Sequence, residues 1–322
     1  MNGGRSCPSD TVAQISVGAK GSDPQGLTPA DGCELHLGDS LAWIRAREPN
    51  SIHAIVTDPP YGLKEYSEIE KGKLRGGRGG VWRIPPTLDG CRRSPLPRFT
   101  VLDRDDRAAL CTFFAVFARE AIRVLVPGGH VMIATNPLLS HCVYAPMLEA
   151  GFEKRGEIVR LVQTLRGGDR PKNAHVEFAG ISVMPRSGWE PWGLFRKPCE
   201  GRVQDNLRKW RTGGLRRTSA AEPFRDVIRS APTRSAERRI APHPSLKPQA
   251  FMRQLVGAAL PLGEGIVLDP FMGAGSTIAA CIALGYRGIG IELDPTYFAT
   301  ARSTIPMLAR LQVGSADDDG RR

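Results

Sequence analysis

The stretch Ile266-Val-Leu-Asp-Pro-Phe-Met-Gly-Ala-Gly-Ser276 joins a short apolar run to a helical pattern through a Gly-x-Gly turn. Gly273 and Gly275 allow a tight turn and a close approach of the backbone to a ligand. The start of the helix beyond the turn favours a carboxylate or a phosphate. The stretch therefore predicts a strand–turn–helix unit of an α/β protein, with a ligand held at the turn.

A second predicted strand, residues 288–291, ends at Glu292, which follows Gly273 by 19 residues. This spacing matches the acidic residue that binds ribose hydroxyls in nucleoside-binding βαβ units. The turn has neither the complete GxGxxG of dinucleotide sites nor the GK[ST] of a P-loop, which disfavours NAD and ATP. S-adenosylmethionine is the best-fitting cofactor, and an ordinary glycine-rich turn is the alternative.

Strand and helix patterns also alternate in the rest of the chain, which predicts a mainly parallel, doubly wound sheet. Asp39 is placed to cap the first predicted helix. The remaining predicted strands are residues 33–37, 52–57, 130–135, 157–165, 176–184 and 265–268, and the predicted helices are residues 40–47, 105–125, 138–150, 249–260, 274–284 and 295–311.

The motif Asp58-Pro59-Pro60-Tyr61 directly follows the predicted strand 52–57, where ligands bind in open α/β sheets. The prolines restrict the turn and remove backbone donors. A carboxylate and a carbonyl that accept both N–H bonds of an exocyclic amine would localise the nitrogen lone pair, and Tyr61 would stack on the base. In duplex DNA that base must first leave the helix. The alternative is a structural turn with an Asp cap.

The net charge of +11 is concentrated in two segments. Residues 186–239 carry 14 Lys/Arg and 6 Asp/Glu, and residues 71–98 carry 8 Lys/Arg and 1 Asp. Such segments are typical of a nucleic-acid-binding surface, although a solvated basic surface is the alternative.

The seven cysteines are scattered and form no CxxC pair. This argues against a disulfide framework or a metal site, and it favours a reducing cytoplasm. No run of about 18 apolar residues predicts a membrane span, and the N-terminal residues do not resemble a secretory signal.

The order of the motifs resembles that of the beta-class DNA amino-methyltransferases, which methylate adenine N6 or cytosine N4. In that class DPPY comes first, a target-recognition region follows, and the glycine motif comes last. The resemblance covers residues 33–311 and implies a Rossmann-like sheet that uses S-adenosylmethionine. It rests on DPPY, the glycine motif, Gly38-Asp39-Ser40, Pro127-Gly128-Gly129, His243-Pro-Ser-Leu-Lys-Pro248 and Gly290-Ile-Glu-Leu-Asp294.

The resemblance also implies a role for each matching residue. Without it, Asp39 would be only a helix cap and Lys247 only a solvated charge. The implied catalytic residues are Asp58, Pro59, Pro60 and Tyr61, and the implied cofactor-binding residues are Asp39, His243, Ser245, Lys247, Asp269, Phe271, Gly273, Gly275, Ser276, Thr277 and Glu292.

Five parts of the chain are expected. Residues 1–30 and 313–322 are predicted disordered tails. Residues 31–185 form the catalytic half, with a long loop at 62–104, residues 186–242 form a basic target-recognition region, and residues 243–312 form the cofactor-binding half.

The predicted activity is transfer of a methyl group from S-adenosylmethionine to a flipped-out base of double-stranded DNA. Because an Asp-headed motif leans towards adenine in this class, N6 of adenine is favoured over N4 of cytosine. An RNA or protein amide methyltransferase would carry the motifs in the opposite order, and the intact motifs argue against a non-catalytic DNA-binding module. The recognition sequence, a partner restriction endonuclease, and monomer against homodimer stay open.

Overall fold

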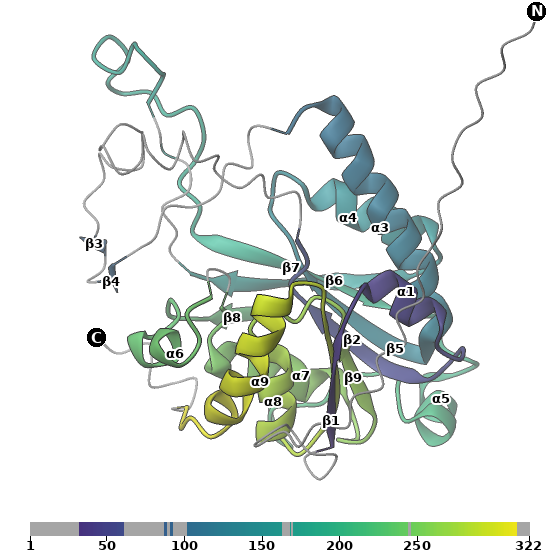
Figure 1. The fold of residues 1–322 in the computed structure, drawn as a ribbon. Helices are drawn as coiled ribbons and strands as arrows, with labels where there is room; N and C mark the ends of the chain where they lie inside the picture. Colours follow the sequence, from purple (N-terminus) through teal and green to yellow (C-terminus); the bar gives the residue numbers. More distant parts are fainter. Residues whose placement is uncertain are drawn as a thin grey trace, which may run out of the picture.

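The structure, a computed structural model, describes residues 32–60, 102–162, 168, 170–243 and 246–313, together with the backbone of 87–88 and 91–92. Its centre is an eight-stranded sheet in the order β1-β10-β9-β2-β5-β7-β6-β8 (Figure 1). The strands are β1 (Cys33–Leu37), β2 (Ile52–Thr57), β5 (Leu125–Ala134), β6 (Glu153–Leu161), β7 (Trp189–Arg196), β8 (Val227–Arg229), β9 (Ile266–Asp269) and β10 (Arg287–Glu292), while β3 (Thr87–Leu88) and β4 (Cys91–Arg92) form a separate pair.

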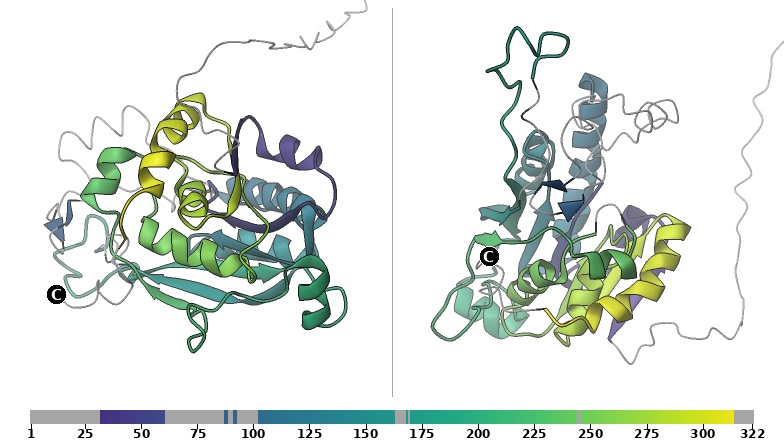
Figure 2. Two further views of the ribbon diagram at one scale, coloured as in Figure 1. Left: turned by 90° about the horizontal axis from the view of Figure 1, so that it is seen from below. Right: turned by 90° about the vertical axis from the view of Figure 1, so that its left-hand side faces the viewer.

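Helices cover both faces of this sheet (Figures 1 and 2). Helix α3 contacts both α1 and α4, and α8 contacts both α7 and α9. Since the connections β2–α3–β5 and β9–α8–β10 run in opposite directions along the sheet, right-handed crossovers put α3 and α8 on opposite faces. The helices are α1 (Ser40–Arg45), α3 (Arg104–Val124), α4 (Ser140–Glu149), α5 (Val203–Trp210), α6 (Ser235–Ile240), α7 (Gln249–Ala259), α8 (Ser276–Ala283) and α9 (Pro295–Ala309).

Helix α3 illustrates why these residues form these elements. Asp103 caps its first turn in a capping box with Asp106. Its apolar side chains recur every three or four residues, so that Phe114 and Phe117 are fully buried. Burying each of these rings stabilises the fold by about 1.5–3 kcal/mol. The helix ends at Val124, as its pattern predicted to within a residue.

The predicted strand at residues 176–184 is wrong. The described chain there forms turns and bends, and Val176 and Val183 are 79% and 65% exposed. Alternating apolar residues make a strand only where another strand pairs with them, and none of the described strands lies beside this segment.

The strand that occupies this place in the sheet is β7, inside the segment expected to recognise the target. It pairs antiparallel with both β5 and β6. Pro191 and Gly193 weaken a strand prediction, because proline lacks a ladder donor and glycine lacks a side chain to pack. Part of residues 186–242 therefore belongs to the central sheet.

The Pro127-Gly128-Gly129 sequence also differs from expectation. It lies inside β5, which already begins at Leu125, instead of preceding the strand. Gly128 has φ +77°, and a Cβ there would lie 2.4 Å from the Asn206 amide nitrogen, so glycine is required for α5 to pack against this strand. Within the described chain, no helix is long and apolar enough to cross a bilayer.

Candidate active site

Asp58 and Asp269 lie at the carboxyl ends of two neighbouring parallel strands. Asp58 directly follows β2, and Asp269 is the last residue of β9. The Thr57 hydroxyl donates to Asp269 Oδ1 at 2.7 Å, a buried bond between residues 212 positions apart. Because ligands bind beyond the carboxyl ends of strands in open α/β sheets, this edge is where a site is expected.

Asp269 holds the turn that follows β9. Its Oδ1 also accepts the Phe271 backbone N–H at 3.2 Å. Burial raises the pKa of Asp269 to about 6, and hydrogen bonds from Thr277, Thr57 and Phe271 oppose part of this rise. The carboxylate therefore remains an acceptor at neutral pH and ties the turn to β2.

The glycine turn needs the conformations that glycine supplies. Gly273 has φ +53° and Gly275 has φ +83°. A Cβ at Gly275 would lie 2.3 Å from Ile305 Cγ1, so a side chain there would collide with α9. The turn therefore packs closely against α9 at the point where α8 begins.

Glu292, the last residue of β10, fastens the same turn from the other side. Its Oε2 accepts the Gly273 N–H at 2.9 Å, and its Oε1 accepts the Asp294 N–H at 2.8 Å. The 19-residue spacing seen in the sequence thus corresponds to direct contact between Glu292 and the glycine turn.

Asp58 forms an ion pair with Lys247 through its Oδ2. Its Oδ1 is buried, and no hydrogen-bond partner reaches it from the described residues. Burial raises the pKa of Asp58, which Lys247 opposes and the nearby Glu190 reinforces. One carboxylate oxygen is therefore held by a cation, and the other is a buried acceptor without a donor.

Two further charged residues, Glu190 and Arg160, extend the ion pair beyond Lys247. The sequence predicted a site role for neither of them. Glu190 of β7 lies 3.8 Å from Lys247 Nζ, and Arg160 of β6 lies 3.3 Å from Glu190. Strand register brings them together, since Arg160 is directly opposite Glu190 in the β6–β7 ladder. Neither belongs to a recognisable motif, so no local pattern could have revealed them.

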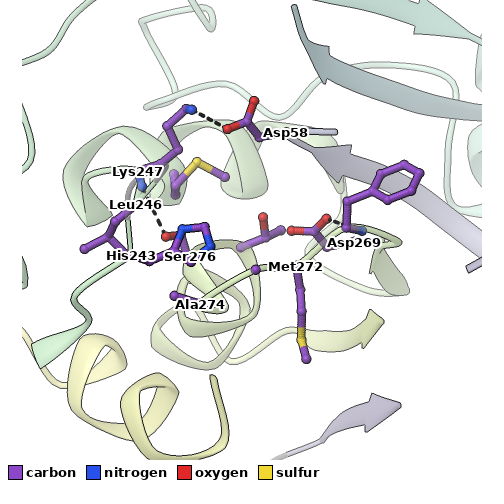
Figure 3. Close-up of a pocket in the computed structure, with 12 residues that line it drawn as sticks. Asp58, His243, Leu246, Lys247, Asp269, Met272, Ala274 and Ser276 are labelled. Carbon is purple, nitrogen blue, oxygen red and sulfur yellow. Dashed lines mark hydrogen bonds and ion pairs between the residues drawn. The ribbon is translucent and has the colours of Figure 1, made fainter. Parts of the chain in front are cut away.

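These groups surround a pocket, shown in Figure 3. The Lys247 and Asp58 side chains point toward each other along one side of it, and Asp269, Ala274 and Ser276 lie on the opposite side. The lining residues are Asp58, His243, Leu246, Lys247, Met252, Asp269, Phe271, Met272, Gly273, Ala274, Ser276 and Thr277.

His243 packs edge-on against Tyr297 of α9, with ring centroids 4.5 Å apart. Burial and the Lys247 charge lower the pKa of His243 to about 4. The imidazole is therefore neutral at pH 7. Its Cε1 would lie 3.2 Å from a Cβ at Gly273, so the ring closes tightly over the glycine turn.

The structure brings eight of the expected site residues into this pocket lining: Asp58, His243, Lys247, Asp269, Phe271, Gly273, Ser276 and Thr277. Gly275 and Glu292 adjoin it through the contacts described above. Pro59 and Pro60 continue the chain after Asp58. Tyr61 and Ser245 lie outside the described residues.

Asp39 is not part of the pocket lining. Its Oδ1 accepts the Ala42 N–H at 2.7 Å and caps α1, as the sequence predicted. The preceding Gly38 donates to the Glu292 carbonyl at 2.9 Å, so Asp39 stands beside the end of β10. Capping of α1 therefore explains the position of the Asp39 side chain, and the backbone bond to β10 keeps this residue near the site.

The lining of the pocket fits S-adenosylmethionine in charge. A sulfonium cation would be attracted by Asp58 and Asp269, which outnumber Lys247 among the charged residues of the described lining. Gly273 lines the pocket without a side chain, and a Cβ there would lie 3.2 Å from the His243 ring. Phe271 packs against two rings of α3, Phe113 and Phe117, at 6.0 and 5.8 Å, which fixes the turn against that helix.

The model of the N6/N4 DNA methylase family matches residues 52–303, and the chain belongs to this family. It is an S-adenosylmethionine-dependent DNA methyltransferase of the N6/N4 type. Type II methyltransferase M.HindIII of Haemophilus influenzae is 26% identical over 282 residues, which are 80% of this chain and 90% of that protein.

A second relative and two solved structures complete the comparison. DNA adenine methyltransferase YhdJ of Escherichia coli is 40% identical over 73 residues, which are 23% of this chain and 22% of that protein. The PvuII DNA methyltransferase, described as cytosine-N4-specific, has a TM-score of 0.54 at 14% identity and covers 89% of both chains. TTHA0409 of Thermus thermophilus, complexed with S-adenosyl-L-methionine, has a TM-score of 0.52 at 20% identity, over 86% of this chain and 96% of its own. These structures share the Rossmann-like α/β fold of this chain.

Proposed function

We propose that this protein methylates the exocyclic amine of a base flipped out of double-stranded DNA, and that the base is adenine and the atom N6. The observation that carries the proposal is that Asp58 Oδ1, a buried carboxylate oxygen at the pocket, accepts no hydrogen bond from the described part of the chain. A buried acceptor left unpaired destabilises a protein by about 1–3 kcal/mol, so such an atom indicates a ligand donor. An amine N–H is a donor of the required kind.

The cofactor side of the pocket is assigned to the glycine turn and its supports. S-adenosylmethionine would supply the methyl group as an electrophilic sulfonium. Phe271, Gly273 and Gly275 would enclose its methionine part, with Ser276 and Thr277 at the start of α8 favouring its carboxylate. Glu292 would accept from the ribose, while His243 and Lys247 would close the other side of the pocket. Three further expected residues lie beyond the described lining. Asp39 and Ser245 are proposed to bind the cofactor, and Tyr61 is proposed to stack on the target base.

Asp58 would act on the target amine in two ways. The amine is a weak nucleophile because its lone pair is delocalised into the ring. Accepting one N–H at Oδ1 and the other at a carbonyl of the Asp58–Pro60 turn would localise that lone pair towards the methyl group. Methylation leaves the nitrogen positively charged, and a carboxylate whose pKa is raised by burial is suited to receive the proton it releases.

Adenine is favoured over cytosine by two observations. The motif is headed by Asp58 instead of a serine. The local relative with the highest sequence identity among those reported above is a DNA adenine methyltransferase. The cytosine-N4 enzyme shares the fold at 14% identity, which supports the fold alone. Cytosine N4 is therefore the second candidate.

The net charge of +11 supports duplex DNA as the substrate, since phosphate contacts by Lys and Arg dominate affinity for DNA. Arginine-rich residues 186–239 would supply many of these contacts.

The experiment is methyl transfer onto unmethylated duplex DNA, followed by digestion to nucleosides and identification by mass. We expect N6-methyladenine from the wild type and none from Asp58→Ala. Glu34→Ala, which removes an exposed carboxylate from β1, should retain activity. Finding N4-methylcytosine would overturn the choice of base, and finding no methylated nucleoside with purified, cofactor-binding protein would overturn the DNA substrate.

A further inference from the structure

Glu190 occupies an unusual place for a carboxylate in a basic segment. It lies in β7, between β5 and β6 in the sheet, with only 18% of its side chain exposed. Its Oε1 accepts the Trp192 indole N–H at 2.8 Å and lies 3.8 Å from Lys247 Nζ. A carboxylate of this kind, held by a neighbour on its own strand, has a fixed direction towards Lys247.

Arg160 holds the other oxygen of Glu190 at 3.3 Å and is itself only 5% exposed. Its Nε also donates to Ser230 Oγ at 3.0 Å and its Nη2 to the Ala231 carbonyl at 3.3 Å. Trp192 is fully buried against Phe251 of α7. Glu190 is therefore hydrogen-bonded by two buried side chains, those of Arg160 and Trp192.

The chain of contacts runs from this anchor to the reacting end of the site. Lys247 is only 10% exposed and contacts Asp58 Oδ2 on one side and Glu190 on the other. A flexible lysine stem carries about 2 kcal/mol of rotamer entropy, so an isolated ammonium would sample several positions. A second carboxylate restricts Lys247 to the one position that also engages Asp58.

We propose that Glu190 is a positioning residue for methyl transfer: it holds the Lys247 ammonium against Asp58 Oδ2, so that Oδ1 is the oxygen that faces the target amine. This inference rests on the proposed function and assigns a role to a strand that the motifs do not include. Without Glu190, Lys247 gains freedom to bridge both Asp58 oxygens, and the acceptor for the amine is lost.

Glu190 also affects the charge state of Asp58. Its negative charge raises the pKa of the Asp58 carboxyl, while Lys247 lowers it. Replacing Glu190 by Gln removes the first effect and strengthens the second. The acid limb of the activity profile should therefore move to lower pH, a change that loss of fold stability would not produce.

The same two strands provide a matched control. Glu153 of β6 pairs with Arg196 of β7 at 2.6 Å, at the far end of the β6–β7 ladder from Glu190. Glu153→Gln removes a carboxylate from an Arg–Glu pair of the same kind, yet it touches neither Lys247 nor Asp58. Comparing the two variants separates a role in the site from a role in holding the strands together.

The experiment measures transfer of radiolabelled methyl groups to duplex DNA by the full chain across pH, with thermal unfolding of each variant. We expect Glu190→Gln to lower kcat by about 10- to 100-fold with an unchanged KM for S-adenosylmethionine. Its acid limb should move to lower pH, while Glu190→Asp should restore the wild-type limb. Glu153→Gln should match the wild type in kcat and pH profile.

If Glu190→Gln does not fold, Trp192→Phe provides the test, because it removes the donor that fixes Glu190 and leaves the carboxylate charge in place. Its kcat should fall without a shift of the acid limb. An active wild type together with a Glu190→Gln or Trp192→Phe variant of unchanged kcat would overturn the positioning role. A wild type that transfers no methyl group to DNA would instead overturn the proposed function.

Discussion

Replacing Asp269 by Asn should stabilise the folded protein relative to the wild type at neutral pH. This advantage should develop as the pH rises from 3.8, the ordinary pKa of the carboxyl, to about 6, its raised pKa in the folded protein. Burial at the end of β9 disfavours the charged form in the folded state, whereas the unfolded chain ionises normally. Each pKa unit corresponds to about 1.4 kcal/mol, so at neutral pH the ionised carboxylate lowers the free energy of unfolding by about 3 kcal/mol.

The sign follows from proton binding. Between the two pKa values the folded state binds more protons than the unfolded state, so the wild type loses stability as the pH rises and the Asn variant does not. Below 3.8 both states are protonated and the difference vanishes. Asn keeps an oxygen that can accept from Thr57 and from the Phe271 N–H, which limits other effects of the substitution.

The assay is urea unfolding of both proteins at several pH values between about 5 and 7.5, with circular dichroism as the signal for unfolding. The advantage of the variant should grow by about 1.4 kcal/mol over this range. Asp294→Asn is the control without a pH trend, because backbone N–H groups of Tyr297 and Thr296 lower the pKa of Asp294 from 3.8. Its carboxylate is ionised in both states across this range, so the stability difference of this variant should stay constant. A stability difference for Asp269→Asn that is constant across pH would refute the reasoning.

Three further outcomes are expected. Gly275→Ala should lower the free energy of unfolding by about 1–3 kcal/mol through strain and collision, and Ile305→Ala should recover part of the loss in thermal unfolding of the double variant. The acid limb of kcat/KM should lie above 3.8, because burial raises the pKa of Asp58, and Lys247→Met should move it higher still; a limb unaffected by this change would contradict the ion pair. The logarithm of DNA affinity should fall with the logarithm of salt concentration by about 0.9 per phosphate neutralised, and a flat response would exclude the basic segments as the DNA-binding surface.

Much of the fold followed from local patterns. Helix α3 was predicted from its apolar spacing, and β9, the glycine turn and β10 were predicted from a short apolar run and two glycines. These features depend on conformational preferences over a few residues and on which side chains face the core. For the same reason, the pocket residues that belong to compact motifs could be named from the sequence.

The failures concern pairing between distant segments. The alternation at residues 176–184 resembled a strand, and β7 with Pro191 and Gly193 did not. A strand is defined by its hydrogen-bonded neighbours, and β7 has one on each side. Burial between two strands outweighs the poor intrinsic preference of these residues.

From the sequence alone one obtains the motif order, the glycine turn and the acidic residues at strand ends, because each is encoded within a few neighbouring positions. The grouping of Asp58, Lys247 and Glu190 came only with the tertiary structure. It arises because β2 pairs with β9, and β7 inserts between β5 and β6, so that residues separated by up to 189 positions share one edge of the sheet. Such proximity is a property of strand order, which no local pattern encodes.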